Sequence, residues 1–185
     1  MTTLLSLLLV TSMSLQPGEP VATVPSVDLD RYLGRWLEVA RLPNQFQDQC
    51  ASDVTADYVR RDDGRIGVTN RCRRADGTVD QAEGVARVVD TSTNAKLKVR
   101  FAPAWLSFLP FVWGDYWVIG LADDYRFAVV GSPDRKYLWV LSRSPELPEP
   151  DWQQAMQVAR RNGFDVSQLV RTKQTPPSGG THPAG

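Results

Sequence analysis

The chain has 185 residues, a size typical of one domain with a single hydrophobic core. Its 21 basic and 21 acidic residues cancel and form no basic stripe, which argues against a nucleic-acid partner. The one histidine, His182, lies in a Pro/Gly-rich tail, so His-based metal sites and Ser-His or Cys-His catalysis are nearly excluded. We therefore expect a protein that is not an enzyme and that holds no metal or cofactor.

Residues 1–25 are predicted to form a signal peptide and a linker. Residues 4–10 are a short apolar run, which is too short to span a bilayer but typical of the apolar region of a secretory signal. A basic segment before this run is missing, and the alternative is a free apolar N-terminus. No cysteine follows the run, so a lipid anchor is not supported. Residues 16–27 are expected to be loose.

The sequence contains two cysteines, Cys50 and Cys72. An even count in an exported chain favours a disulfide. The two residues also face each other across a predicted hairpin. The alternative is a pair of buried free thiols.

Eight segments alternate apolar and polar residues with a period of two, which predicts strands. A helical turn over 28–34 precedes them, and tight turns at Asp62-Asp63-Gly64 and Ala75-Asp76-Gly77 separate some of them. The predicted strands cover residues 36–42, 53–60, 65–73, 78–89, 96–101, 116–121, 126–131 and 137–143.

The period changes after the last of these strands. Asp151 is predicted to cap a helix whose apolar face carries Trp152, Ala155, Met156 and Ala159 at helical spacing. Gly163 is predicted to end this helix. Residues 164–172 are expected to add a short strand, and residues 173–185 to be a disordered tail.

Consecutive strands on short turns, followed by one amphipathic helix, predict an all-β fold. We expect an eight-stranded antiparallel up-and-down β-barrel over residues 26–172, with the C-terminal α-helix packed on its outside. Gly34 and Trp36 are predicted to close one end, where strand direction also places Arg143. A guanidinium stacks well on an indole, so Arg143 is expected to cover Trp36.

The inner face of this barrel is predicted to be apolar, with small residues on the strand 78–89 that leave space for a ligand. Lys96, Lys98 and Arg100 are expected to face solvent. Glu38 shares the face of Trp36, where it either pairs with a polar group or has a raised pKa. The expected ligand-binding residues are Ala56, Tyr58, Val68, Asn70, Ala86, Val99, Phe101, Tyr116, Val118 and Trp139.

The apolar segment 102–114 is expected at the open end, where two prolines prevent a regular element. Its Trp105, Phe108, Phe111 and Trp113 are expected to cover the cavity, contact a membrane surface or pack against a second protomer as a homodimer. The alternative is that the loop folds inward and fills the barrel. Polar contacts to a ligand head group are expected from Asn44, Gln45, Arg73, Arg74, Arg135 and Lys136.

These residues resemble the lipocalins, and more closely the bacterial lipocalins related to apolipoprotein D and the plant temperature-induced lipocalins. Gly34-Arg35-Trp36 matches the first lipocalin motif and Arg143 the third, whereas Ala122 takes the place of the usual aspartate in the second. The departure suggests that the closed end is braced differently.

The resemblance implies a lipocalin barrel that carries a fatty acid or lysophospholipid for envelope storage, transport or maintenance. It also implies a location in the periplasm or at the outer membrane. Two alternatives remain: an interaction or membrane-docking module built on segment 102–114, or a lipocalin-fold enzyme acting on an apolar substrate.

Overall fold

A computed structural model of the chain describes residues 19–103, 109 and 112–175. The helices and strands follow the predicted order. They are α1 (Leu29–Tyr32), β1 (Gly34–Arg41), η1 (Gln45–Gln47), β2 (Ser52–Arg60), β3 (Ile66–Arg73), β4 (Val79–Val88), β5 (Lys96–Arg100), β6 (Gly114–Leu121), β7 (Phe127–Gly131), β8 (Leu138–Ser142), α2 (Glu149–Arg161), η4 (Val166–Gln168) and β9 (Val170–Arg171).

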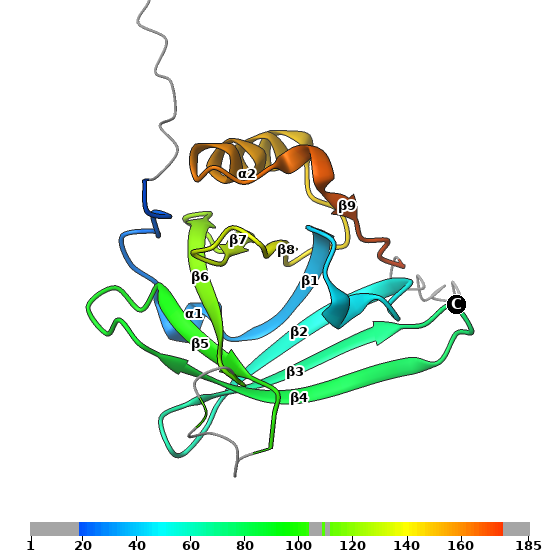
Figure 1. Cartoon of the computed structure of the whole chain (residues 1–185), viewed down its shortest axis with the longest axis horizontal. Helices are drawn as coiled ribbons and strands as arrows, with labels where there is room; N and C mark the ends of the chain where they lie inside the picture. Colours follow the sequence, from blue (N-terminus) through cyan, green and yellow to red (C-terminus); the bar gives the residue numbers. More distant parts are fainter. Residues whose placement is uncertain (1–18, 104–108, 110–111, 176–185) are drawn as a thin grey trace, which may run out of the picture.

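The strands form one closed barrel, as predicted. Each strand from β1 to β8 pairs antiparallel with the next along the chain, and β1 also pairs antiparallel with β8. Figure 1 shows the barrel in this order, with β2, β3 and β4 as its long strands. The predicted strand bounds agree with the structure to within about two residues, because glycines with positive φ occupy the turns at Gly64 and Gly77.

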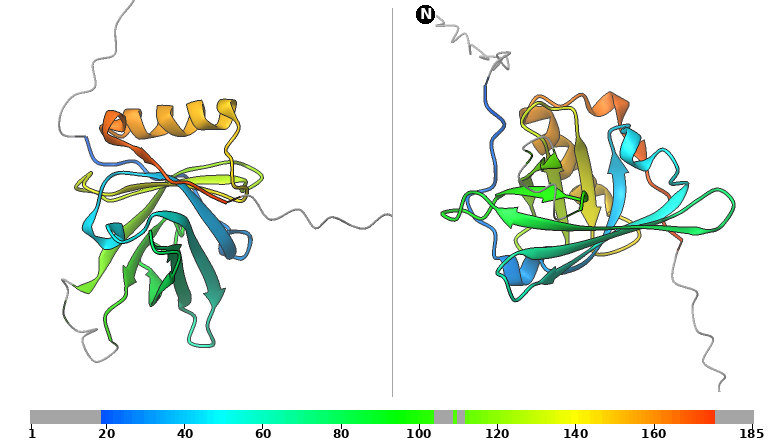
Figure 2. Two further views of the ribbon diagram at one scale, coloured as in Figure 1. Left: turned by 90° about the vertical axis from the view of Figure 1, so that its right-hand side faces the viewer. Right: turned by 60° about the horizontal axis from the view of Figure 1, so that its bottom comes forward.

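Helix α2 packs on the outside of the barrel, over β6, β7 and β8 (Figure 2). Its Ala155, Met156 and Ala159 join a buried cluster with residues such as Val129 and Val140 from the sheet. The predicted cap at Asp151 is wrong. The cap position is held by Pro148, and Asp151 lies in the first turn, where its carboxylate pairs with Arg126 at 2.7 Å.

Strand β1 has a bulge between Glu38 and Ala40. Strict alternation from Trp36 and Glu38 predicts that Ala40 also faces the barrel interior. The extra residue instead moves Ala40 into the cluster beneath α2. Beyond Leu37, β1 no longer pairs with β2, and β9 pairs with it instead.

Both ends of the described chain pack on the barrel. The Val21 side chain is buried and the Val24 amide donates to the Val118 carbonyl, so this part of the expected loose segment is ordered. At the other end, the Gln174 amide donates to the carbonyls of Glu38 and Val54. These two bonds bridge the gap between β1 and β2 from the second residue of the predicted tail.

Candidate functional site

The closed end of the barrel is held by Arg143, as predicted. Its guanidinium lies 3.8 Å from the centre of the Trp36 ring system. The same group donates to the carbonyls of Arg31, Tyr32, Leu33 and Arg35 at 2.6 to 3.2 Å. The Trp36 side chain is fully buried, and its indole nitrogen donates to the Tyr32 carbonyl. One side chain therefore ties the α1–β1 junction to the end of β8.

Gly34 allows the chain to turn tightly beneath the barrel. Its φ of 89° lies in the left-handed region that favours glycine. A Cβ atom added there would also lie 3.5 Å from a nitrogen of Arg143, so the position is next to the clasp.

Arg31 provides the different brace that Ala122 suggested. Its guanidinium donates to the Asp123 carbonyl at 2.9 Å and lies 4.1 Å from the centre of the Tyr125 ring. Tyr125 in turn accepts a hydrogen bond from the backbone amide of Asp28. The sequence did not reveal this contact because its partners are far apart along the chain.

Three tyrosines form the floor of the barrel just above Trp36. The hydroxyl of Tyr116 lies 2.8 Å from that of Tyr32 and 2.9 Å from that of Tyr58. Burial raises the pKa of Tyr58 to about 12 and the pKa of Tyr116 well above its ordinary value, so both remain neutral. Because the hydroxyls bond one another, the rings rather than polar groups face the space above.

A small cavity lies beside these rings. Its volume is about 10 Å³, and its remaining lining is apolar, with Ile66, Ala86, Leu97 and Val99. Such a space holds about one water molecule, whereas drug-sized ligands occupy pockets of roughly 300–1,000 Å³. An acyl chain therefore needs the barrel above the floor.

The inward-facing residues above the floor remain accessible to solvent. Tyr58, Val68, Ala86 and Val118 are buried at the floor. Toward the other end, residues of the same inward face are half-buried or exposed, so solvent reaches them. These residues are Ala56, Asn70, Ala82, Gly84 and Trp139.

Asn70 is the polar member of this group, and its side-chain oxygen is buried with no hydrogen-bond partner in the described part of the chain.

Phe101 lies at the open end of the barrel rather than deep inside it. It follows β5 directly and is 45% exposed. Its ring covers Gly84, since a Cβ atom added to Gly84 would come within 2.7 Å of it. Alternation thus predicted the correct face of Phe101 but not its height along the barrel.

The predictions for Arg100 and Trp113 are both wrong, because the two side chains pack against each other. Arg100 is 5% exposed rather than solvated, and Trp113 lies over it on the outer wall at 5.1 Å, with Arg87 4.3 Å from the same ring system. Trp113 is 8% exposed, and it packs on Arg87 and Arg100, which lie on the outer face of β4 and β5, rather than over the cavity. The indole shields the guanidinium, which periodicity alone could not predict. The predicted mouth residues Trp105, Phe108 and Phe111 lie outside the described residues.

A polar cluster occupies one side of the barrel near its open end. Glu38 is 3% exposed and pairs with Arg41 at 2.8 Å, so the first of the two alternatives for Glu38 is correct. Gln47 donates to the second Glu38 oxygen at 2.6 Å and accepts from the Trp139 indole at 2.9 Å. Arg41 and Gln47 were not among the predicted site residues, because alternation places Arg41 on the face opposite Glu38 and only the bulge turns it inward.

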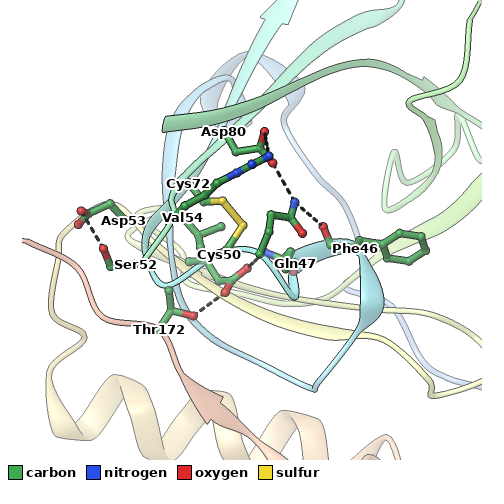
Figure 3. The surroundings of a disulfide bond; sticks show 12 residues. Phe46, Gln47, Cys50, Ser52, Asp53, Val54, Cys72, Asp80 and Thr172 are labelled. Atoms are coloured by element: carbon green, nitrogen blue, oxygen red, sulfur yellow. Dashed lines mark hydrogen bonds and ion pairs between the residues drawn. A yellow bond between two sulfur atoms is a disulfide. The ribbon is translucent and has the colours of Figure 1, made fainter. Parts of the chain in front are cut away.

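The disulfide between Cys50 and Cys72 is present and holds the loop that carries Gln47 against β3 (Figure 3). Its Cα atoms are 5.5 Å apart. Phe46 in the same loop is 59% exposed, and its ring lies 5.4 Å from Tyr137. The loops β1–β2 and β7–β8 therefore meet at the open end, as strand direction predicted.

Four of the cations expected to bind a head group are already engaged. Arg73 pairs with Asp53, Arg74 with Asp80 and Lys136 with Asp134, while Arg135 donates to backbone carbonyls. Asn44 likewise uses its side chain within its own loop, at Leu42, Phe46 and Gln47. Gln45 is exposed.

Within the described ranges, no group of His, Cys, Asp and Glu side chains could hold a metal ion. No helix in the same ranges is long and apolar enough to cross a membrane.

Comparison with known proteins agrees with this geometry. A family model for a lipocalin-like domain matches residues 27–174. The outer membrane lipoprotein Blc of Escherichia coli K12 is 42% identical over 168 residues, which cover 90% of this chain and 90% of the relative. The temperature-induced lipocalin-1 of Arabidopsis thaliana is 40% identical over 164 residues, which cover 86% of this chain and 87% of the relative.

Solved structures show the same fold at lower identity. Insecticyanin from the tobacco hornworm Manduca sexta superposes with a TM-score of 0.65 at 22% identity, covering 84% of this chain and 85% of that one. Lobster apocrustacyanin A1 gives a TM-score of 0.64 at 15% identity, covering 86% and 93%.

Proposed function

The chain belongs to the lipocalin family, whose members bind small hydrophobic ligands, and from this premise we propose that its barrel carries a fatty acid or a lysophospholipid. One observation supports this most strongly. The apolar inward-facing residues are buried at the floor and solvent-accessible above it, which supports a ligand cavity that opens at one end. Family members typically bind or transport their ligands, and we propose no reaction.

The lining supports one orientation of the ligand. The floor presents aromatic rings and aliphatic side chains, with the tyrosine hydroxyls turned toward one another. The end of an apolar chain fits this surface, whereas a charged head group there would lose its hydration without a partner. The chain therefore points toward Tyr58 and Tyr116, and the head group lies toward Trp139 and the opening.

The energetics allow useful affinity. Burying an acyl chain gains about 0.8 kcal/mol per CH₂ relative to water, or on the order of 10 kcal/mol for a long chain. This gain stands against an association cost of roughly 4–15 kcal/mol. Relative to a bilayer the gain nearly vanishes, so head-group contacts at the opening decide what is extracted.

We also propose that the protein is exported and works in the cell envelope. The support is its similarity to outer membrane lipoproteins of Escherichia coli and Vibrio cholerae and the apolar run at residues 4–10. Phe46, Val79 and Phe101 are exposed apolar residues at the open end, which suits transfer of a lipid at a membrane surface.

The test is a titration of delipidated protein with a fluorescent fatty acid. We expect saturable binding of one ligand per chain. Trp139→Ala should weaken it, whereas Trp152→Ala, on the outer helix, should leave it unchanged. An absence of saturable binding, with no effect of the Trp139 substitution, would contradict the proposal.

A further inference from the structure

A buried ion pair stands on the inward face of the barrel near its opening. Strand register places Glu38 opposite Leu141 and Arg41 opposite Trp139. Both of these partners belong to, or pack against, the interior cluster of the barrel. The side chain of Arg41 is only 13% exposed, so the pair lies within the wall of the ligand site rather than on the outer surface.

The carboxylate of Glu38 is fully engaged. One oxygen accepts from Arg41 and from the Thr172 hydroxyl, and the other accepts from the Gln47 amide. Gln47 in turn holds the Trp139 indole that faces the site. The cluster is thus fixed by hydrogen bonds from β1, from the disulfide-bonded loop and from the chain after β9.

The pair changes what Arg41 can recognise. A lone guanidinium in a poorly solvated site binds a carboxylate strongly, often through two hydrogen bonds. Here Glu38 already lies 2.8 Å from Arg41 and cancels its charge. A ligand carboxylate entering this region would leave one uncompensated negative charge, which is costly away from water.

The other polar groups near the opening do not replace this lost attraction. Among the described residues near the opening, Arg73, Arg74 and Lys136 are each paired with an aspartate, and Arg135 is directed to the backbone carbonyls of Glu19 and Asn162, at the end of α2.

Two buried polar atoms of this region have no hydrogen-bond partner in the described part of the chain: the Asn70 side-chain oxygen, which accepts, and the Arg41 Nε, which donates. A hydroxyl can both donate and accept, whereas a carboxylate can only accept.

We propose that Glu38 determines head-group specificity: by neutralising Arg41, it makes the barrel select single-chain lipids whose head group carries no net charge over fatty acid anions. This inference rests on the proposed function and narrows it. The favoured ligands are monoacyl lipids with a hydroxyl-bearing or zwitterionic head group.

The test compares lipids that share one acyl chain. Oleate at pH 9, monoolein and 1-oleoyl-lysophosphatidylcholine are used, each below its aggregation threshold, to displace a neutral fluorescent dye from delipidated protein. We expect wild type to bind the two lipids without net charge more tightly than oleate. Glu38→Gln leaves Arg41 charged and uncompensated, so its relative affinity for oleate should rise by about tenfold or more. Glu83→Gln, at an exposed position of β4, should resemble wild type.

A double variant, Glu38→Gln with Arg41→Gln, removes both charges and keeps the shapes. It should retain the wild-type preference even if the single variant folds poorly. The proposal is overturned if wild type prefers oleate, if folded Glu38→Gln leaves the ratio unchanged, or if the double variant prefers oleate. If no lipid displaces the dye from wild type, the proposed function itself fails. If the lipids bind without the expected preference, the role of Glu38 in specificity is refuted and the proposed lipid-carrier function is not.

Discussion

Arg143→Ala should destabilise the fold while leaving the ligand cavity largely unchanged. The guanidinium stacks on Trp36 and donates to four backbone carbonyls at the closed end. Neither Arg143 nor Trp36 lines the small cavity beside the floor rings, although Tyr32 and Leu33 do. The structure therefore assigns Arg143 to stability, and removing it should act through unfolding.

The magnitude follows from the contacts. Hydrogen bonds from a charged donor contribute roughly 1.5–3 kcal/mol each. The carbonyls of Arg31 and Arg35 lie in exposed surroundings, where water replaces the donor, whereas those of Tyr32 and Leu33 are part-buried. Two strong hydrogen bonds and a stacking contribution of about 1 kcal/mol predict a loss of about 4–7 kcal/mol. Arg143→Lys should lose less, because it keeps the charge but not the planar stack.

The assay is equilibrium urea unfolding with the disulfide intact. Arg65→Ala is the matched control, because Arg65 is exposed and pairs only with a neighbouring exposed aspartate, Asp63. We expect the control to lie within about 0.5 kcal/mol of wild type. A loss below about 1 kcal/mol for Arg143→Ala, or one equal to that of the control, would refute the assignment.

Three further predictions concern the floor and the mouth. Trp36→Ala should lower the free energy of unfolding by about 3–5 kcal/mol, and intact stability with abolished ligand binding would contradict its role as a plug. Replacing Cys50 and Cys72 by serine should lower the free energy of unfolding by about 3 kcal/mol for a loop of this length, as measured by urea unfolding. It should also speed ligand release, as measured by stopped-flow. An unchanged release rate would show that the Gln47 loop does not need the bridge. Alkaline pH should destabilise the fold, because burial raises the pKa of Tyr58 to about 12 and that of Tyr116 above its ordinary value. The tyrosines of the unfolded chain ionise first, so the contribution of the buried tyrosines to the free energy of unfolding is complete below about pH 10 and is lost as pH rises through the folded pKa values. If the free energy of unfolding of Tyr58→Phe fell equally steeply with pH, the assignment would be contradicted.

The barrel and its closed end could be predicted because their signals are local or stereotyped. Period-two alternation defines the strands, and the direction of each strand then places Arg143 beside Trp36. The tight turns carry glycine where positive φ is required, as at Gly64 and Gly77. These features depend on neighbours along the chain, which a single sequence displays.

Other features depend on contacts that alternation does not encode. A bulge in β1 moved Ala40 to the outer side, and nothing in the local pattern marks it. Arg100 and Trp113 were misplaced because a cation can be buried beneath an indole on the outer wall.

The same limit applies to the candidate site. Its inward face was predictable, but the contact between Tyr32, Tyr58 and Tyr116 joins α1, β2 and β6. The partners of Glu38 likewise come from the following loop and from the chain after β9. Depth within the barrel, as for Phe101, is set by strand length and loop position rather than by side-chain alternation.

The central claim is that the open barrel holds one single-chain lipid. Native mass spectrometry of the protein purified under gentle conditions, after incubation with a total envelope lipid extract, tests it most directly. We predict a complex of one chain with one monoacyl lipid, which Trp139→Ala depletes and Trp152→Ala does not. A chain that stays free of lipid, or that carries diacyl lipids equally in both variants, would contradict the account.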